Sequence, residues 1–217
     1  MFEEIYQRQS NVGLKIPNSI LVIGCGGVGA WVSIFFAMVG VKNITLIDHD
    51  SIEVHNLNRL PFTIESVGKP KVEVLKDFIK TIRPSTSIIS LNTRFEEIEE
   101  VLPPMYDVVI ECTDNVKTQN IVRKWCRRNG VKLVEAHYDF NPELNDWTIT
   151  VTYFKDPSKI PDAWAVDEEI TGYTITPSYV VPAVLVASIV VHVVVKELDQ
   201  INISSRSINE VLLKNSL

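Results

Sequence analysis

Cysteine is scarce in this chain: its 217 residues contain three, and no two of them form a C-x-x-C pair. The sequence therefore gives no indication of a zinc knuckle or of a disulfide framework. Its first residues lack a basic region followed by an apolar stretch, so no signal peptide is predicted. We expect a cytoplasmic protein that keeps its thiols reduced and holds no structural zinc.

Positive charge is in deficit as well. The 21 lysines and arginines are outnumbered by 27 aspartates and glutamates, which gives a formal net charge of −6. This balance argues against a general affinity for nucleic acids or for anionic membranes. The one long apolar run, Tyr179 to Val195, has about 17 residues, the short limit for a membrane-spanning helix, and it contains Pro182 and His192. We expect a buried core helix or a dimer-interface helix there.

The first part of the chain alternates apolar runs with turns. Ser19 to Ile23 has the composition of a strand buried on both faces of a parallel sheet, and Asn43 to Ile47 is similar. Between them, a glycine turn leads into an apolar helix over Ala30 to Val39, which Gly40 ends. Strand, turn, helix and strand make a βαβ unit, for which a right-handed crossover is expected.

The pattern changes at Asp146 to Phe154, where apolar residues alternate with threonines as in a half-exposed strand. Ser178 is expected to cap the long apolar helix. We predict one α/β domain over residues 1–217, with a Rossmann-like, mostly parallel sheet flanked by helices, a C-terminal mixed or antiparallel extension and a crossover loop. Further helices are expected over 69–82, 95–101 and 115–129, further strands over 87–91, 106–110, 131–135 and 210–213, and the crossover loop over 155–177.

A glycine turn, Gly24-x-Gly26-Gly27-x-Gly29, follows the first strand and opens the first helix. Glycine at these places lets the backbone approach a phosphate, and the N-terminus of the helix supplies N–H donors. The motif alone fits NAD, FAD or ATP equally well, and it also fits a tight turn that binds nothing. It therefore predicts a nucleotide site without choosing the nucleotide.

Acidic residues follow two of the expected strands, at the edge where open α/β sheets bind ligands. Asp48 ends the second strand, where a carboxylate can accept hydrogen bonds from ribose hydroxyls, and Asp50 is the second candidate. Asp114 follows the strand over 106–110 and is a candidate ligand for Mg²⁺, a cation that prefers oxygen. The alternative for Asp114 is to cap the next helix, and both roles can hold at once.

Asn56, Arg59, Lys69 and Lys71 argue against a plain dehydrogenase site. NAD needs little positive charge beyond its pyrophosphate cradle, whereas a triphosphate under attack needs cations on the oxygens that gain charge. Arg59 can bind phosphate oxygens as a fork, and Lys71 can act as a point charge. Any single lysine is most simply a solvated side chain, but the whole ordered set favours ATP.

Together these segments resemble the ThiF/MoeB/HesA family, the prokaryotic relatives of ubiquitin-activating enzymes. The resemblance rests on Gly-x-Gly-Gly-x-Gly, Asp-x-Asp, Asn-Leu-Asn-Arg, Gly-Lys-Pro-Lys and Cys-Thr-Asp-Asn in this order, and it runs from Tyr6 to about Leu198. It implies that the C-terminal carboxylate of a small ubiquitin-like protein, sulfur-carrier protein or peptide attacks the α-phosphate of ATP. Pyrophosphate would leave and an acyl-adenylate would form.

The resemblance also implies roles for residues at matching positions. Asp50 would hold the ribose, and Asp114 would hold Mg²⁺ close to the reacting α-phosphate. The residues that would contact the phosphates are Asn56, Arg59 and Lys71.

An arginine near the start of the chain extends the resemblance to a second subunit. Arg8 lies in a segment similar to the family's Arg-Tyr-x-Arg-Gln, although Ile5 replaces the first arginine here. The resemblance implies that Arg8 reaches the ATP of a partner subunit. The protein would then be a homodimer whose sites each contain residues from both copies.

Two features of the family are missing. Many members carry two C-x-x-C pairs for structural zinc, and members that form a thioester or persulfide place a cysteine in the crossover loop, whereas residues 143–177 contain none. Cys126 has basic neighbours that would stabilise a thiolate, but burial is the usual state of a cysteine on a helix. We therefore predict adenylation without an enzyme thioester. The alternatives are a non-catalytic nucleotide-binding scaffold and an NAD- or FAD-dependent oxidoreductase.

Overall fold

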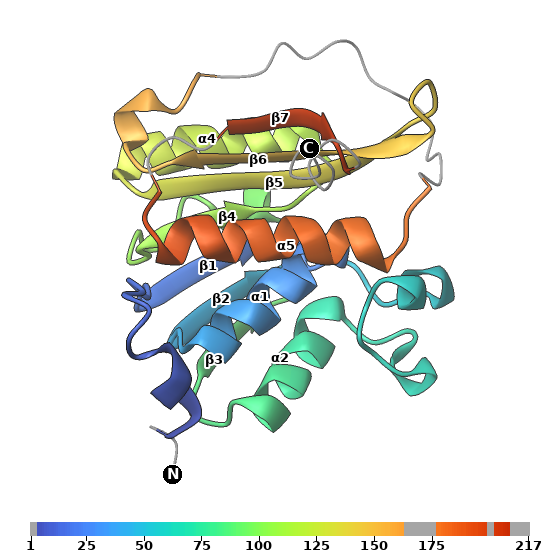
Figure 1. Ribbon diagram of the computed structural model, residues 1–217, viewed down its shortest axis with the longest axis horizontal. Helices are drawn as coiled ribbons and strands as arrows, with labels where there is room; N and C mark the ends of the chain where they lie inside the picture. Colours follow the sequence, from blue (N-terminus) through green and yellow to red (C-terminus); the bar gives the residue numbers. More distant parts are fainter. Residues whose placement is uncertain (1–3, 163–176, 199–201, 209–217) are drawn as a thin grey trace.

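The sheet that carries the glycine turn has seven strands in the order β3-β2-β1-β4-β5-β6-β7. It is seen in a computed structural model that describes residues 4–162, 177–198 and 202–208 (Figure 1). The strands are β1 (Ser19–Ile23), β2 (Asn43–Ile47), β3 (Ser87–Leu91), β4 (Val108–Glu111), β5 (Lys132–Asn141), β6 (Asp146–Phe154) and β7 (Asn202–Ser207).

Strands β1 to β5 run parallel, so their carboxyl ends lie along one edge of the sheet. Ile23 at the end of β1 has Ile47 of β2 as its partner on one side and Glu111 of β4 on the other. Glu111 in turn lies beside Glu135 of β5. The turns after β1, β2 and β4 therefore meet at one edge, as expected for a ligand site in an open α/β sheet.

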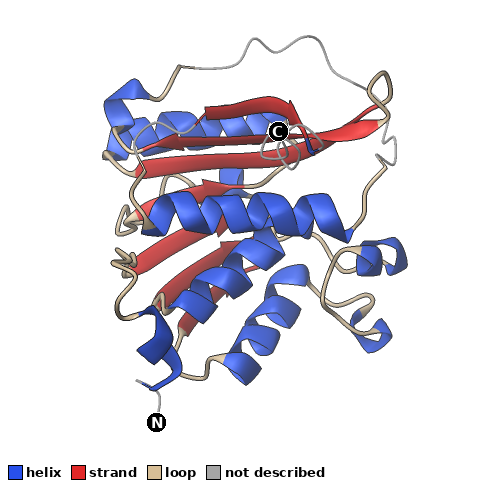
Figure 2. Ribbon diagram, viewed as in Figure 1, coloured by secondary structure: helices blue, strands red, loops and turns tan. Residues whose placement is uncertain are grey.

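Helices cover both faces of the sheet (Figures 1 and 2). Each face has its own apolar core, because alternate residues of β1 point to opposite sides: Ile20 and Val22 to one core, Leu21 and Ile23 to the other. The first core lies under α1 (Gly27–Val39), α2 (Lys71–Ile82) and α5 (Val180–Val195), and the second under α3 (Phe95–Ile98) and α4 (Val116–Asn129).

The C-terminal strands add the expected antiparallel extension. β5 pairs antiparallel with β6 from Leu133 to Asn141, so β5 continues well past residue 135, where the apolar run ends and where the sequence predicted its end. β7, which the sequence did not predict, pairs antiparallel with β6. The strand predicted over 210–213 lies outside the described residues, as does the part of the crossover loop over 163–176.

The apolar helix α5 begins at Val180, two residues after its expected cap. Ser178 is not the N-cap: that position is held by Tyr179, which makes no side-chain capping bond. The Ser178 hydroxyl instead pairs with the hydroxyl of Tyr138. Within the described ranges, the chain has no helix long and apolar enough to span a bilayer.

Candidate functional site

The glycine turn joins β1 to α1 through a backbone path that larger residues would block. Gly24 has a φ of +86°, and a Cβ there would lie 2.9 Å from the carbonyl oxygen of Cys112 in the turn after β4. A Cβ on Gly29 would overlap the carbonyl oxygen of Gly24. No side chain caps the first turn of α1, whose N-cap is Gly26. The N–H donors at this helix end can therefore serve a phosphate.

Asp48 lies where the sequence placed it, at the end of β2, but its carboxylate is engaged with the backbone. One oxygen accepts the N–H of Cys25 at 2.6 Å, and the other accepts the N–H of Asp50 at 2.8 Å. Asp48 thereby ties the glycine turn to the end of β2. Asp50, whose side chain is 50% exposed, is the carboxylate that faces the open edge.

Lys71 begins α2 and brings a positive charge to the same edge. Its ammonium lies 2.8 Å from Asp50, and its side chain is only 11% exposed. Burial alone would lower the pKa of Lys71, but the charges of Asp48 and Asp50 outweigh it and raise the pKa. Burial would likewise raise the pKa of Asp50, yet the Lys71 partner lowers it overall. The pair is therefore ionised over the neutral range.

Arg59 follows the short 3-10 helix η2 (Val54–Asn58) and reaches the start of α1. A Cβ on Gly27 would lie 3.1 Å from the Cδ of Arg59. Its guanidinium donates to the carbonyl of His55 at 3.2 Å and to the side chain of Asn58 at 3.1 Å. Arg59 and Lys71 thus belong to two different segments that both return to the glycine-turn edge.

Asn56 is buried in its own loop. Its side-chain oxygen accepts the N–H of Glu53 at 3.1 Å, and the Glu53 side chain accepts the backbone N–H of Asn56. This reciprocal pair is a capping box that fixes the loop preceding Arg59. The structure therefore gives Asn56 a role in shaping the loop.

Asp114 is exposed in the turn after β4, next to the glycine turn. The alternative of Asp114 as a helix cap is wrong, because Asn115 caps α4 by accepting the N–H groups of Lys117 and Thr118 at 3.0 and 3.2 Å. An exposed carboxylate that is not used as a cap fits a hard cation such as Mg²⁺. At the end of β2, Asp48, His49 and Asp50 also place possible ligand atoms close together, but Asp48 is committed to backbone donors and Asp50 to a lysine.

Arg8 lies far from the glycine turn of its own chain. It is exposed in the 3-10 helix η1 (Glu4–Gln9), which packs at the other end of α1: Gln9 donates to the carbonyl of Val39 at 2.8 Å. The 13 residues of α1 make a helix about 20 Å long at 1.5 Å per residue. Arg8 is therefore a predicted site residue that the structure does not bring to the site of its own chain.

None of the three cysteines has the surroundings of a nucleophile. Cys25 and Cys126 are buried, and burial raises the pKa of both thiols. Cys112 is partly buried, and burial raises its pKa as well. Cys126 was a weak candidate for a reactive thiol because basic residues flank it in the sequence. That candidate is wrong, because the thiol lies in an apolar core.

Two hydroxyls near the glycine turn, those of Tyr138 and Ser178, were not predicted from the sequence. A Cβ on Gly27 would lie 3.1 Å from the hydroxyl oxygen of Tyr138, which is paired with Ser178. Asn58 donates to the carbonyl of Ser178 at 2.7 Å. These contacts fasten the chain just before α5 to the loop of Arg59. Tyr138 gave no signal because its strand was expected to end at residue 135.

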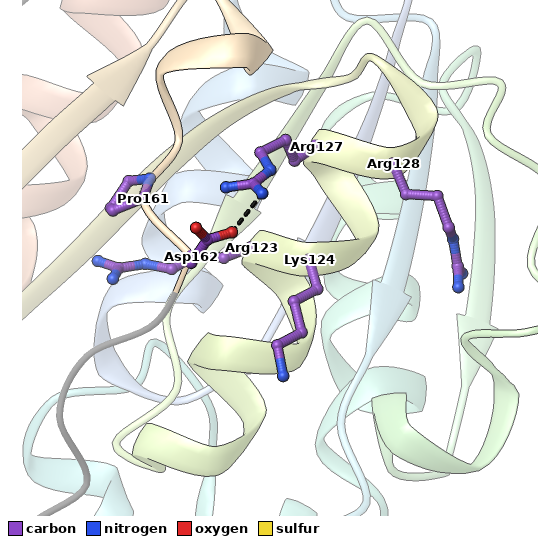
Figure 3. A pocket seen from close by; sticks show the side chains of 6 residues that line it. All are labelled: Arg123, Lys124, Arg127, Arg128, Pro161 and Asp162. Carbon is purple, nitrogen blue, oxygen red and sulfur yellow. Dashed lines mark ion pairs between the residues drawn. The ribbon is translucent and has the colours of Figure 1, made fainter.

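A cavity of about 340 Å³ opens elsewhere, along α4 (Figure 3). Its lining is rich in positive charge, but these charges are largely partnered: Arg127 with Asp162, Arg128 with Glu99, and the buried Arg123 with Glu135. The cavity shares no lining residue with the glycine-turn edge. The residues that line it are Arg123, Lys124, Arg127, Arg128, Pro161 and Asp162.

The fold and this edge of the sheet define a class of protein. Residues 14–214 match the ThiF family, and the chain belongs to that family. The sequence-based resemblance is thereby confirmed, as is the expected fold class.

Particular relatives show how far the likeness extends. Over 118 residues, 53% of this chain and 45% of the relative, it is 39% identical to tRNA threonylcarbamoyladenosine dehydratase of Haemophilus influenzae. Over 119 residues, 54% of this chain and 48% of the relative, it is 36% identical to molybdopterin-synthase adenylyltransferase of Escherichia coli. The chain thus spans about half the length of these curated relatives.

A solved structure covers more of the chain. A crystal structure of Escherichia coli MccB with succinimide matches 82% of this chain and 55% of its own, with a TM-score of 0.69. At 23% sequence identity this likeness shows the fold alone.

Proposed function

We propose that this protein catalyses the ATP-dependent adenylation of a C-terminal carboxylate on a small ubiquitin-like protein, a sulfur-carrier protein or a peptide. Pyrophosphate leaves, and the acyl-adenylate remains. The proposal is supported by membership of the ThiF family and by the similarity to a molybdopterin-synthase adenylyltransferase. The carboxylate is already a nucleophile, so the protein's main task is to place it and to stabilise charge on the phosphates.

The placement of two cations around one glycine turn carries the proposal. Arg59 packs against Gly27, and Lys71 is held by Asp50 beside the carboxylate that fixes the turn. Two cations suit a triphosphate better than they suit NAD, because the departing pyrophosphate gains charge. In this role Lys71 and Arg59 bind phosphate oxygens, the N-terminus of α1 adds N–H donors, and Asp50 binds the ribose.

Mg²⁺ is proposed as the metal, with Asp114 as its ligand. When bound, the ion would neutralise part of the charge on the phosphates. Asp114 suits this role because it is an exposed carboxylate beside the glycine turn. The chain's own contribution is to hold the Asp114 turn through Glu111, whose carboxylate accepts the N–H of Thr113 at 2.7 Å.

A homodimer with Arg8 acting in the partner's site is part of the same proposal. The distance between Arg8 and its own glycine turn supports it, because only another copy can bring Arg8 to that edge. Helices α1 and α5 pack side by side, and the first turn of α5 leaves Val180 and Val181 38% and 46% exposed. A second copy would cover this surface.

ATP–pyrophosphate exchange tests the proposal. Purified protein, Mg²⁺ and a candidate carrier with a free C-terminal carboxylate should return labelled pyrophosphate to ATP. Asp114→Ala should remove the exchange. If the variant keeps its carrier binding and the wild type binds ATP without any exchange, the non-catalytic nucleotide-binding scaffold is the better account.

A further inference from the structure

A buried polar network lies behind the Asp114 turn, between α4 and the sheet. Arg123 of α4 binds the Glu135 carboxylate through two nitrogens, one of them at 2.6 Å. Glu111, the strand partner of Glu135, is fully buried. His137 lies two residues beyond Glu135 on the same face of β5. In the adenylation proposed above Glu111 only holds the Asp114 turn, and the other members of the network have no part.

Two atoms of the network are buried without a hydrogen bond. They are Oε2 of Glu111 and Nδ1 of His137, and they lie 3.8 Å from each other. The other Glu111 oxygen accepts both the N–H and the hydroxyl of Thr113, so Oε2 is the oxygen left to face the imidazole. Leaving such atoms unpaired is costly, and a proton shared between them would satisfy both once they approach within hydrogen-bond distance.

His137 is placed where the pair can meet a substrate. Since Glu111 is level with Glu135 and ends β4, His137 extends past the end of β4 toward the turn that holds Asp114. Its side chain is 24% exposed, while Glu111 behind it is closed to solvent. A buried carboxyl that orients a partly exposed imidazole is the arrangement that makes histidine a general base.

We propose that His137 is a catalytic base for the step after adenylation, and that Glu111 is the positioning residue that orients its imidazole. This inference rests on the proposed function. Adenylation itself releases no proton from the attacking carboxylate, but the next acceptor does. The cysteines of the described chain are not nucleophiles, so the acyl group passes directly from AMP to an acceptor. The acceptor in this proposal is a primary amine.

The transfer step balances through the pair. The amine nitrogen forms a bond to the acyl carbon, and the bond from that carbon to the AMP oxygen breaks, its electron pair leaving with AMP. The proton of the amine moves to Nε2 of His137. The imidazolium that forms is held by its Nδ1–H against the ionised carboxylate of Glu111.

The charges that face the pair set its pH dependence. Burial raises the pKa of Glu111 to about 8, although the Thr113 hydrogen bonds lower it; Glu135 raises it further and Arg123 lowers it. Burial lowers the pKa of His137, against the opposing effect of Glu135 and Asp139. His137 is therefore neutral at pH 7, and ionisation of Glu111 near pH 8 frees Nε2 to act as the base.

The pairing can be tested without any substrate. Nitrogen-15 NMR of the imidazoles, with His137 assigned through His137→Gln, should show a neutral His137 at pH 7. Its shifts should change near pH 8, and Glu111→Gln should abolish that change. If His137 instead protonates between pH 6 and 7, as an ordinary histidine does, and ignores Glu111→Gln, the pair does not exist and the inference fails.

The chemistry is tested by separating the two half-reactions. A synthetic glycyl-glycyl adenylate and glycine ethyl ester serve as probes for amide formation, and ATP–pyrophosphate exchange reports adenylation. His137→Gln should lower the ratio of transfer to exchange by about 100-fold or more, and Glu111→Gln should flatten the rise in transfer near pH 8. His192→Gln, on α5 across the sheet, is the matched control and should leave the ratio unchanged.

Three outcomes separate the claims. A lower ratio in His137→Gln alone supports the base. Equal ratios in His137→Gln and His192→Gln, or a wild type that does not accelerate transfer from the adenylate, overturn the inference while exchange still supports adenylation. Absence of exchange in the wild type counts against the proposed function itself.

Discussion

At the scale of single residues, the charged side chains of the glycine-turn edge are held by particular partners. Asp48 is fixed by two backbone N–H groups, and Lys71 by Asp50. Such contacts orient a cation before a ligand arrives, which reduces the ordering cost of binding. Lys69, two residues from Lys71, has an exposed side chain and makes a natural comparison.

Alanine substitutions should show different contributions of Lys71 and Lys69 to ATP binding. Lys71→Ala should weaken ATP binding about 10- to 100-fold, because a charge-assisted contact to phosphate is lost. Lys69→Ala should change it by less than about twofold, as expected for an exposed charge. Isothermal titration calorimetry with ATP measures both. Equal losses in the two variants would mean that Lys71 acts only through general positive charge.

Glu111 should make stability depend on pH. Its pKa is about 8 in the folded protein against an ordinary 4.5, so the folded state holds the proton more tightly than the unfolded state. Folding stability is therefore lost as pH rises from about 4.5 through 8. The free energy of unfolding of Glu111→Gln, relative to that of the wild type, should rise by roughly 3 kcal/mol between pH 5.5 and pH 8.5. Urea unfolding at the two pH values measures this, and a pH-independent difference would contradict it.

At the scale of elements, the sequence predicts best where one local signal decides. Apolar runs placed β1, β2 and β3 at the right residues. The first two are buried strands, whereas β3 is a partly exposed edge strand. The end of β5 was missed because residues up to Asn141 are strand only through pairing with β6. Asp114 was the alternative candidate for the cap of α4, whereas the cap is Asn115. Both are good capping residues, and only the backbone path separates them.

The candidate site likewise contains residues that the sequence predicts and contacts that only the tertiary structure determines. Gly24, Asp48 and Arg59 carry motif signals and lie at one edge of the sheet. The contact of Tyr138 with the Arg59 loop depends on the length of β5 and on the start of α5, both of which are set by tertiary contacts. The commitment of Asp48 to backbone donors was equally invisible, because a sequence motif gives a position and not the hydrogen-bond partners.

The glycine turn offers a matched test of an element. Gly29→Ala should destabilise the fold by about 3 kcal/mol or more, because the new methyl group meets the Gly24 carbonyl oxygen. Gly26→Ala should cost about 1 kcal/mol or less, since a Cβ there meets nothing within 4 Å. Chemical denaturation of both variants measures the difference. Similar losses would show that the turn is less tightly packed than described.

At the scale of the whole molecule, the remaining question is how Arg8 takes part. The chain's own Arg8 sits at the far end of α1 from the glycine turn. An arginine that acts in the partner's site requires a closed two-fold assembly in which each copy both gives and receives. The apolar faces of α1 and α5 supply a surface on which such an assembly would form.

Mixing two inactive variants tests this arrangement. Arg8→Ala and Lys71→Ala should each be nearly inactive alone. In a mixed dimer the Arg8→Ala subunit keeps its own Lys71 and receives Arg8 from its partner, so one site is complete. Random reassortment should then restore about one quarter of wild-type exchange activity, as two-fold symmetry requires. No recovery after proven subunit exchange would contradict action in trans.

The central claim, that this edge of the sheet activates a carboxylate with ATP, is tested most directly by ATP–pyrophosphate exchange. We predict that labelled pyrophosphate enters ATP only when Mg²⁺ and a carrier with a free C-terminal carboxylate are both present, and that Lys71→Ala or Asp114→Ala abolishes it. Absence of exchange with every carrier tried, together with absence of ATP binding by calorimetry, would contradict the account.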